Sequence, residues 1–155
     1  MRLAPVFRID DLSGAATQAL VKSHLAGMHA NSPPESVHAL DLDKLRQPGV
    51  RFWSGWSGDD IVCMGALKKL DATNGEIKSM RVADAFLGTG AGRAMLHHIV
   101  AEALNMGLKT LWLETGSTDV FTPAIKLYES AGFSVCGPFA DYKLDPFSVF
   151  MMRAL

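Results

Sequence analysis

The chain has 155 residues, of which 48% are hydrophobic, and a formal net charge of −1 at pH 7. This length fits one domain, which we place over residues 1–155, and a domain of this size buries about two thirds of its unfolded surface. The near-neutral charge offers no polycationic surface, so we expect neither nucleic acid nor a membrane as a partner. The charged N-terminus and the lack of a long apolar stretch predict a cytoplasmic protein.

The cysteines and histidines show no metal-binding pattern. Cys63 and Cys136 lie far apart in apolar runs and form no Cys-x-x-Cys spacing, as expected of buried thiols in a reducing compartment. His97 and His98 are adjacent, so on a helix their side chains point about 100° apart. We therefore expect no bound metal.

The first third of the chain predicts one edge strand and two helices. Residues 3–9 alternate between apolar and polar side chains, as in an edge strand. A helix is expected over residues 12–30, with Asp10 or Asp11 as its N-cap. Ser-Pro-Pro-Glu opens residues 32–47 like a capping box with proline in the first turn, which predicts a second helix over that range.

The next segment predicts three consecutive antiparallel strands. Residues 51–57 and 61–70 flank Gly58-Asp59-Asp60, which is typical of a hairpin. A turn at residues 71–75 then returns the chain into residues 76–82. The three strands should form a meander.

Residues 80–93 run from a strand through a glycine-rich turn into a helix. Gly88, Gly90 and Gly92 leave no side chains over the turn, so backbone N–H groups can converge on an anion at the positive end of the helix. A pyrophosphate is the natural ligand for such a turn. A tight turn with no ligand is the alternative when the glycines are considered alone.

Two other nucleotide-binding loops fit this turn less well. A dinucleotide-binding Rossmann loop requires a third small residue where this chain has Arg93, although Glu114 resembles its acidic ribose ligand. A Walker loop requires Gly-Lys-Ser/Thr after the turn, and the sequence lacks that triplet. The Rossmann interpretation is weakened, and the Walker interpretation more so.

Helices and strands alternate after the turn. An apolar face predicts a helix that ends near Gly107, and residues 110–114 have the continuous apolar character of a buried parallel strand. Thr122 is expected to cap a further helix, with Pro123 at its first position and Gly132 after its end. The final strands are expected at residues 133–136 and 148–153. Together these elements predict a mixed α/β sandwich around one central sheet.

The element order and three motifs resemble the GCN5-related N-acetyltransferase (GNAT) superfamily over nearly the whole chain. The motifs are the fourth strand at residues 76–82, the Q/R-x-x-G-x-G/A pyrophosphate loop at residues 87–92 and the A-x-x-L-Y-E-x-x-G-F helix at residues 124–133. The resemblance implies an α/β fold with a mixed, mostly antiparallel central sheet flanked by about four helices. A splayed parallel strand pair in that sheet would hold the cofactor.

Two positions depart from the family pattern. Leu87 stands where the family usually has Gln or Arg, and Phe121 stands where it commonly has Asn. The first change removes a side-chain contact to the cofactor but leaves the backbone amides of residues 88–93. The second change removes a polar contact to the pantetheine arm.

The resemblance also implies a cofactor and a general acid. Acetyl-CoA would be the acyl donor, and no metal would be needed. Met80 and Val82 would pair with its pantetheine arm as with an added strand, and an amide near Met80 would polarise the thioester carbonyl. Tyr128 would protonate the departing thiolate, although packing in the core is its alternative role. The residues expected to bind acetyl-CoA are Met80, Arg81, Val82, Leu87, Gly88, Thr89, Gly90, Ala91, Gly92 and Arg93.

The attacking amine must lose a proton, so a carboxylate with a raised pKa is the expected base. Glu76 lies four residues before Met80, where some histone-type members carry their base, and we favour it over Glu114 at the end of the fifth strand. For either residue, a solvated strand-end carboxylate is the alternative. Acidic groups in the loop at residues 138–146 could attract a cationic amine.

The implied function is transfer of an acetyl group from acetyl-CoA to a primary amine of a small molecule or peptide, by direct attack with Tyr128 as general acid. A noncatalytic acyl-CoA-binding module or sensor is the alternative, motivated by Leu87 and Phe121. A nicotinamide-dependent oxidoreductase is a third option. The amine substrate is the expected partner, and homodimer formation stays open.

Overall fold

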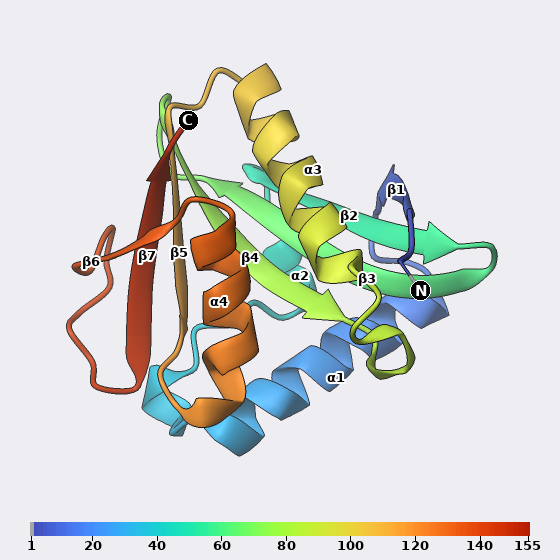
Figure 1. Cartoon of the computed structure of the whole chain (residues 1–155), viewed down its shortest axis with the longest axis horizontal. Helices are drawn as coiled ribbons and strands as arrows, with labels where there is room; N and C mark the ends of the chain where they lie inside the picture. The colour runs from blue at the N-terminus through green and yellow to red at the C-terminus, as the bar shows by residue number, and fades with distance from the viewer. Residues whose placement is uncertain (1) are drawn as a thin grey trace.

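Seven strands form one mixed sheet in the computed structural model, which describes residues 2–155 (Figure 1). The sheet order is β1-β2-β3-β4-β5-β7-β6, and neighbouring strands run antiparallel except for the parallel pair β4 and β5. The strands are β1 (Val6–Ile9), β2 (Val50–Ser57), β3 (Asp60–Lys69), β4 (Asn74–Val82), β5 (Thr110–Gly116), β6 (Ser134–Cys136) and β7 (Ser148–Ala154). The expected mostly antiparallel sheet is confirmed.

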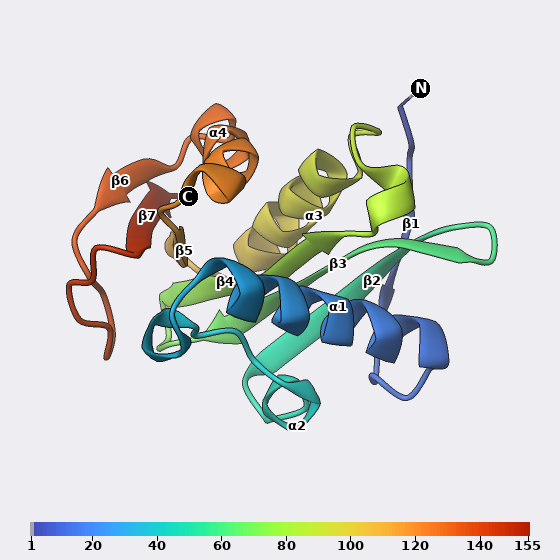
Figure 2. The same cartoon turned by 90° about the horizontal axis from the view of Figure 1, so that it is seen from below.

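Helices cover both faces of this sheet, as Figure 2 shows. Helices α1 (Ala15–Asn31) and α2 (Leu42–Leu45) lie on one face, and α3 (Ala91–Asn105) and α4 (Thr122–Ser130) lie on the other. Short 3-10 turns are formed by Pro34–Ser36, Asp84–Phe86 and Asp119–Phe121. Within residues 2–155, no helix has both the length and the apolar character needed to cross a membrane.

The larger core lies between the sheet and helices α3 and α4. Met95 and Ile99 of α3 are buried in one cluster with Leu111 and Leu113 of β5. Gly65 of β3 lies beneath this helix, where a Cβ atom would come within 2.7 Å of Ile99 Cδ1. The missing side chain therefore lets α3 approach the sheet closely. A smaller core on the opposite face consists of Leu12, Leu20, Val21, Leu45, Phe52, Met64 and Ala66.

Strands β4 and β5 pair over their first halves and then separate. The parallel pairing runs from Asn74 with Thr110 to Ile77 with Leu113. Both strands continue beyond these residues, β4 to Val82 and β5 to Gly116, without pairing to each other. The expected splayed parallel pair is thus confirmed.

A β-bulge lies on β4 at the start of this separation. Gly65 of β3 faces two residues of β4, Ser79 and Met80, because the register shifts between Met64 and Ala66. Ser79 adopts a φ of 57°, in the left-handed region that residues other than glycine rarely adopt. The bulge turns the end of β4 away from β5.

The first helix begins later than expected, at Ala15, and neither Asp10 nor Asp11 caps it. Its N-cap is Gly14, which has no side-chain cap bond. Asp10 instead accepts a hydrogen bond from the Leu12 amide at 2.7 Å, so its carboxylate fixes the turn before the helix.

The prediction of one helix over residues 32–47 was wrong. A 3-10 turn at Pro34–Ser36 is followed by extended chain, and α2 is confined to Leu42–Leu45. Proline does begin the turn, as expected, but Val37 already has extended backbone geometry, with φ of −91° and ψ of 114°. Ser36 then donates a hydrogen bond to Asp145 at 2.6 Å, which ties this segment to the loop between β6 and β7.

Helix α4 begins at Thr122 rather than after it. Its N-cap is Phe121, without a side-chain cap bond, so Pro123 is the second helical residue. The Phe121 ring packs directly over Gly116 at the end of β5, where any side chain on residue 116 would overlap it. Phe121 therefore has a packing role at the position where the family commonly has Asn.

Candidate functional site

The glycine-rich turn leaves the first amides of α3 free. Gly88 and Gly90 have φ values of 75° and 84°, which favour glycine. The amide of Ala94 donates into the helix, to the Gly90 carbonyl at 3.0 Å, and the amides before it precede the helical bonding pattern. Among the described residues, no side chain caps this helix, and its first turn has no acidic residue. The amides and the helix dipole are therefore available to an anion.

Arg2 lies over the same turn. The Leu3 amide donates to the Thr89 carbonyl at 2.8 Å, and a Cβ atom on Gly90 would lie 3.3 Å from Arg2 Cγ. Leu87 is 65% exposed and contributes no charge. A cation is unfavourable beside the positive end of a helix unless an anion also binds there. Arg2 thus brings to the turn the positive charge that Leu87 lacks.

A small cavity of about 60 Å³ lies where β4 and β5 separate. His24 of α1 lines it from one face of the sheet, and Tyr128 of α4 lines it from the other. The bulge of β4 contributes Ser79 and Met80 to the wall of this cavity, and β5 contributes Glu114. The cavity therefore connects the two faces of the sheet at the point where the strands diverge.

Tyr128 is buried beside this cavity and remains protonated. Its ring packs edge-on against Phe133, with centroids 6.0 Å apart. Burial raises the pKa of the Tyr128 hydroxyl, and the nearby Glu114 carboxylate raises it further. A protonated phenol facing a cavity is a suitable proton donor.

Glu114 has the properties of a proton acceptor. Burial raises the pKa of its carboxyl group, and this effect outweighs the opposing hydrogen bond from Ser148. The Ser148 hydroxyl donates to Glu114 Oε2 at 2.8 Å, which fixes the carboxylate at the edge of the cavity. A carboxylate with a raised pKa accepts a proton more readily near neutral pH.

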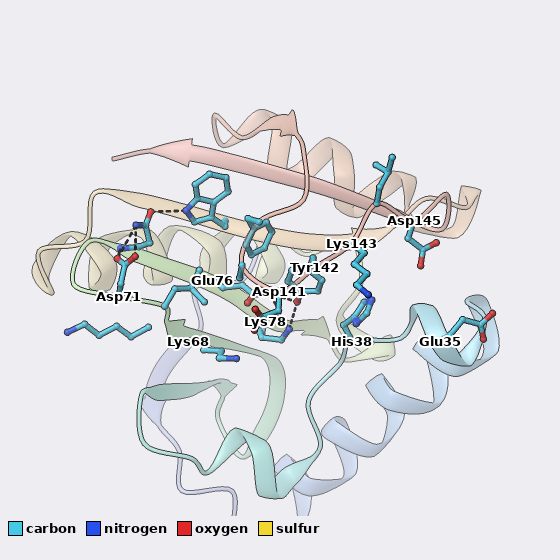
Figure 3. A pocket seen from close by; sticks show the side chains of 17 residues that line it. Glu35, His38, Lys68, Asp71, Glu76, Lys78, Asp141, Tyr142, Lys143 and Asp145 are labelled. Carbon is cyan, nitrogen blue, oxygen red and sulfur yellow. Dashed lines mark hydrogen bonds and ion pairs between the residues drawn. The ribbon is translucent and has the colours of Figure 1, made fainter.

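A much wider pocket, of about 890 Å³, is drawn in Figure 3. One of its walls is aromatic: the Phe139 ring lies 5.3 Å from that of Trp112 and 4.9 Å from that of Tyr142, measured between centroids. His38 and Lys78 line both spaces, so the wide pocket leads toward the point where the strands separate.

Glu76 is held in a hydrogen-bonded cluster in the wide pocket (Figure 3). Its Oε2 atom accepts hydrogen bonds from Lys78 Nζ at 3.1 Å and from the Tyr142 hydroxyl at 2.5 Å. The Lys78 and Glu76 side chains are only 9% and 3% exposed. The Glu76 carboxylate is therefore already paired with the Lys78 ammonium and with the hydroxyl of the half-buried Tyr142.

The structure separates the two carboxylates that the sequence offered as bases. Glu114 lines the small cavity together with Tyr128, whereas Glu76 lines the wide pocket. Of the late loop, Tyr142 lines that pocket, and Asp145 accepts a hydrogen bond from the Ser36 hydroxyl. The loop therefore contributes an aromatic wall as well as acidic groups.

Arg2 and His24 were missed by the sequence analysis. No local motif marks Arg2, which reaches the turn only through the fold. His24 had a weak signal, because Thr17, Leu20, Val21 and His24 lie at i, i+3, i+4 and i+7 and are all buried on α1. This spacing places His24 on the buried face of α1, where a polar side chain indicates a candidate functional residue.

Comparison with known sequences places these features in one family. A model of the Acetyltransferase (GNAT) family matches residues 17–133. YsnE, an uncharacterized N-acetyltransferase of Bacillus subtilis, is 53% identical over 96% of this chain and 98% of its own. YedL, an uncharacterized N-acetyltransferase of Escherichia coli, is 49% identical over 96% of this chain and 93% of its own.

Solved structures share the fold. A structure from Klebsiella pneumoniae, named as an acyl-CoA N-acyltransferase, has a TM-score of 0.80 at 25% identity and covers 97% of both chains. A GNAT family acetyltransferase from Elizabethkingia anophelis with acetyl-CoA bound has a TM-score of 0.71 and covers 97% of this chain and 98% of its own. That second chain is 17% identical, so its likeness shows the fold alone.

Proposed function

Because this chain belongs to the GNAT family of acetyltransferases, we propose that it transfers an acetyl group from acetyl-CoA to a primary amine of a small molecule or peptide. The observation that carries this proposal is the cavity where β4 and β5 separate. Tyr128, a protonated phenol, and Glu114, a carboxylate with a raised pKa, line the same small space. Acyl transfer to an amine needs one proton donor and one proton acceptor at such a point.

The glycine-rich turn fits the pyrophosphate of acetyl-CoA, which supplies the acetyl group as a thioester. The free amides at the start of α3 and the positive charge of Arg2 would hold the phosphates. Met80 lies in the bulge and Val82 follows it, on the part of β4 that does not pair with β5, so their backbone groups are free to pair with the pantetheine arm. The proposed binding segment remains residues 80–82 and 87–93.

The two carboxylates are suited to different tasks. Glu114 would take the proton of the attacking amine, and Tyr128 would give its proton to the leaving sulfur. Glu76 was favoured as the base from the sequence, but its bonds to Lys78 and Tyr142 support the alternative, Glu114. Glu76 would then shape the wide pocket.

The wide pocket is suited to the body of the acceptor. Its volume of about 890 Å³ is within the usual range for small-molecule sites. Its aromatic wall offers an apolar contact surface, and Lys68, Lys69 and Asp141 add charges of both signs at its border. An amine whose body rests here would reach the small cavity past His38 and Lys78.

Two measurements test the proposal. Calorimetry should show that acetyl-CoA and CoA bind and that NAD does not. This result would exclude a nicotinamide-dependent oxidoreductase. Release of free thiol from acetyl-CoA across a panel of primary amines should then identify acceptors. Binding of acetyl-CoA without thiol release above the rate without amine, across the whole panel, would favour the noncatalytic acyl-CoA sensor instead.

A further inference from the structure

Two of the residues that line the small cavity carry a buried polar atom without a partner among the described residues. His24 and Ser79 are 8% and 7% exposed. Within residues 2–155, His24 Nδ1 and Ser79 Oγ form no hydrogen bond, and both residues line the cavity. An unpaired buried polar atom is unfavourable, because it has lost its hydrogen bonds to water without replacing them. Two such atoms on residues that line one cavity indicate that a polar group binds beside them.

The size of the cavity limits that polar group. A volume of about 60 Å³ has room for a group the size of an amine nitrogen or one or two water molecules. Tyr128 and Glu114 line the same space, so the group lies beside the proposed proton donor and acceptor. The body of the acceptor must stay in the wide pocket.

Resting on the proposed function, we propose that His24 and Ser79 hold the attacking nitrogen of a primary amine. A neutral primary amine carries two N–H groups while its lone pair attacks the thioester carbon. One of these protons passes to Glu114 as the carbon–nitrogen bond forms, and the other stays on the amide product. His24 Nδ1 accepts the N–H that stays, and Ser79 Oγ shares that N–H as a second acceptor.

The remaining electrons and protons balance without any further reactant. The carbon–sulfur bond breaks, its electron pair leaves on sulfur, and Tyr128 donates the proton that makes the free thiol. The proton on Glu114 then returns through solvent to the Tyr128 oxygen. His24 keeps one protonation state throughout and therefore acts by positioning the nitrogen.

The electrostatic surroundings keep His24 neutral, as this role requires. Burial, with a smaller contribution from the positive Arg81, lowers the pKa of His24 to about 4. Near neutral pH the imidazole is therefore uncharged, and the tautomer with its proton on Nε2 leaves Nδ1 as an acceptor. A secondary amine would have no N–H left for this atom after losing its proton to Glu114.

The test compares His24→Leu, His24→Asn and the wild type, with the best primary amine from the panel and its N-methyl derivative. His24→Leu should lower kcat/KM for the primary amine about tenfold and reduce the preference over the N-methyl amine. Calorimetry should show unchanged affinity for acetyl-CoA. His24→Asn places an amide near the Nδ1 position and should restore most of the lost activity.

Stability provides an independent measurement, because a packing role and a binding role predict opposite changes. His24→Leu removes an unpaired polar atom, so its Tm should equal or exceed that of the wild type. His29→Leu is the matched control, on the exposed part of α1. Ser79→Ala should lower the same preference and serves if His24→Leu does not fold.

Two results would overturn the assignment. An unchanged ratio of kcat/KM between the primary and N-methyl amines in His24→Leu and Ser79→Ala would show that neither residue holds the nitrogen. A wild-type protein that acetylates no amine would contradict the proposed function and, with it, this assignment. The first result leaves the proposed function intact, so the two failures are distinguishable.

Discussion

The Tyr142 hydroxyl donates a hydrogen bond to Glu76 Oε2 at 2.5 Å, although the two residues are 66 positions apart in the chain. Lys78 Nζ contacts the same carboxylate oxygen at 3.1 Å. The Tyr142 hydroxyl therefore links a buried ion pair within β4 to the loop between β6 and β7. Removing one partner of such a pair leaves an uncompensated buried charge.

Glu76→Gln should therefore destabilise the fold by about 3 kcal/mol, because the Lys78 ammonium loses its counter-charge. Urea unfolding measures this change. The combined variant Glu76→Gln with Lys78→Met removes both charges and should recover much of the loss. Equal stability of the wild type and Glu76→Gln would show that the pair contributes nothing.

Glu114→Gln should remove the acidic limb of the kcat/KM profile against pH, whereas Glu76→Gln should keep it. A base works only when deprotonated, so the rate rises with pH through the raised pKa of Glu114. Glu129→Gln, at an exposed position on α4, is the control. The comparison needs a second amine of different pKa, because the acceptor titrates too. Loss of the limb in Glu76→Gln alone would reverse the two roles.

Features with a local cause were predictable from the sequence. The hairpin follows from the two-residue turn at Gly58-Asp59, and the free amides of α3 follow from Gly88 and Gly90. The helix predicted over residues 32–47 does not form, because the local capping pattern was overridden by a contact of this segment with a distant loop. Local patterns carry no information on such contacts.

The choice between two bases shows the same limit within the site. Both carboxylates lie at an end of a predicted strand, and only the family position four residues before Met80 favoured Glu76. The difference arises from Tyr142 and Ser148, which come from segments much later in the chain. The contribution of Arg2 to the glycine turn is likewise a consequence of tertiary structure.

Tyr128→Phe should lower kcat about 100-fold while leaving acetyl-CoA affinity nearly unchanged. The hydroxyl is needed only when the sulfur leaves, and the ring keeps its packing against Phe133. Single-turnover kinetics should confirm that the chemical step is measured. An unchanged rate for that step would leave Tyr128 as a packing residue.

Arg2→Met should weaken CoA binding about tenfold, because a charge-assisted contact to phosphate is lost. Calorimetry measures the affinity, with any purification tag placed after Leu155. Arg8→Met is the matched control, since Arg8 lies over the Trp56 ring, 4.7 Å from its centroid. Dephospho-CoA, which keeps the pyrophosphate, should show the same loss. A loss seen only with CoA would assign Arg2 to the 3′-phosphate instead.

His24 should make the fold less stable in mild acid. Its pKa is about 4 in the folded protein against an ordinary value of 6.5, so the unfolded chain binds more protons between these values. Stability therefore rises with pH across this window and is lost as the pH falls, by about 3 kcal/mol between pH 7.5 and pH 4.

Urea unfolding of the wild type and His24→Leu across this pH range isolates the contribution of His24. Other titratable or charged groups near His24 are Arg81 and, in the cavity wall, His38, Lys78, Glu114 and Tyr128, and they remain in both proteins. The wild type should therefore lose about 3 kcal/mol more than His24→Leu between pH 7.5 and pH 4. His29→Leu, at an exposed position, should follow the wild type. Parallel curves for the wild type and His24→Leu would mean that His24 titrates normally and is not buried as a neutral imidazole.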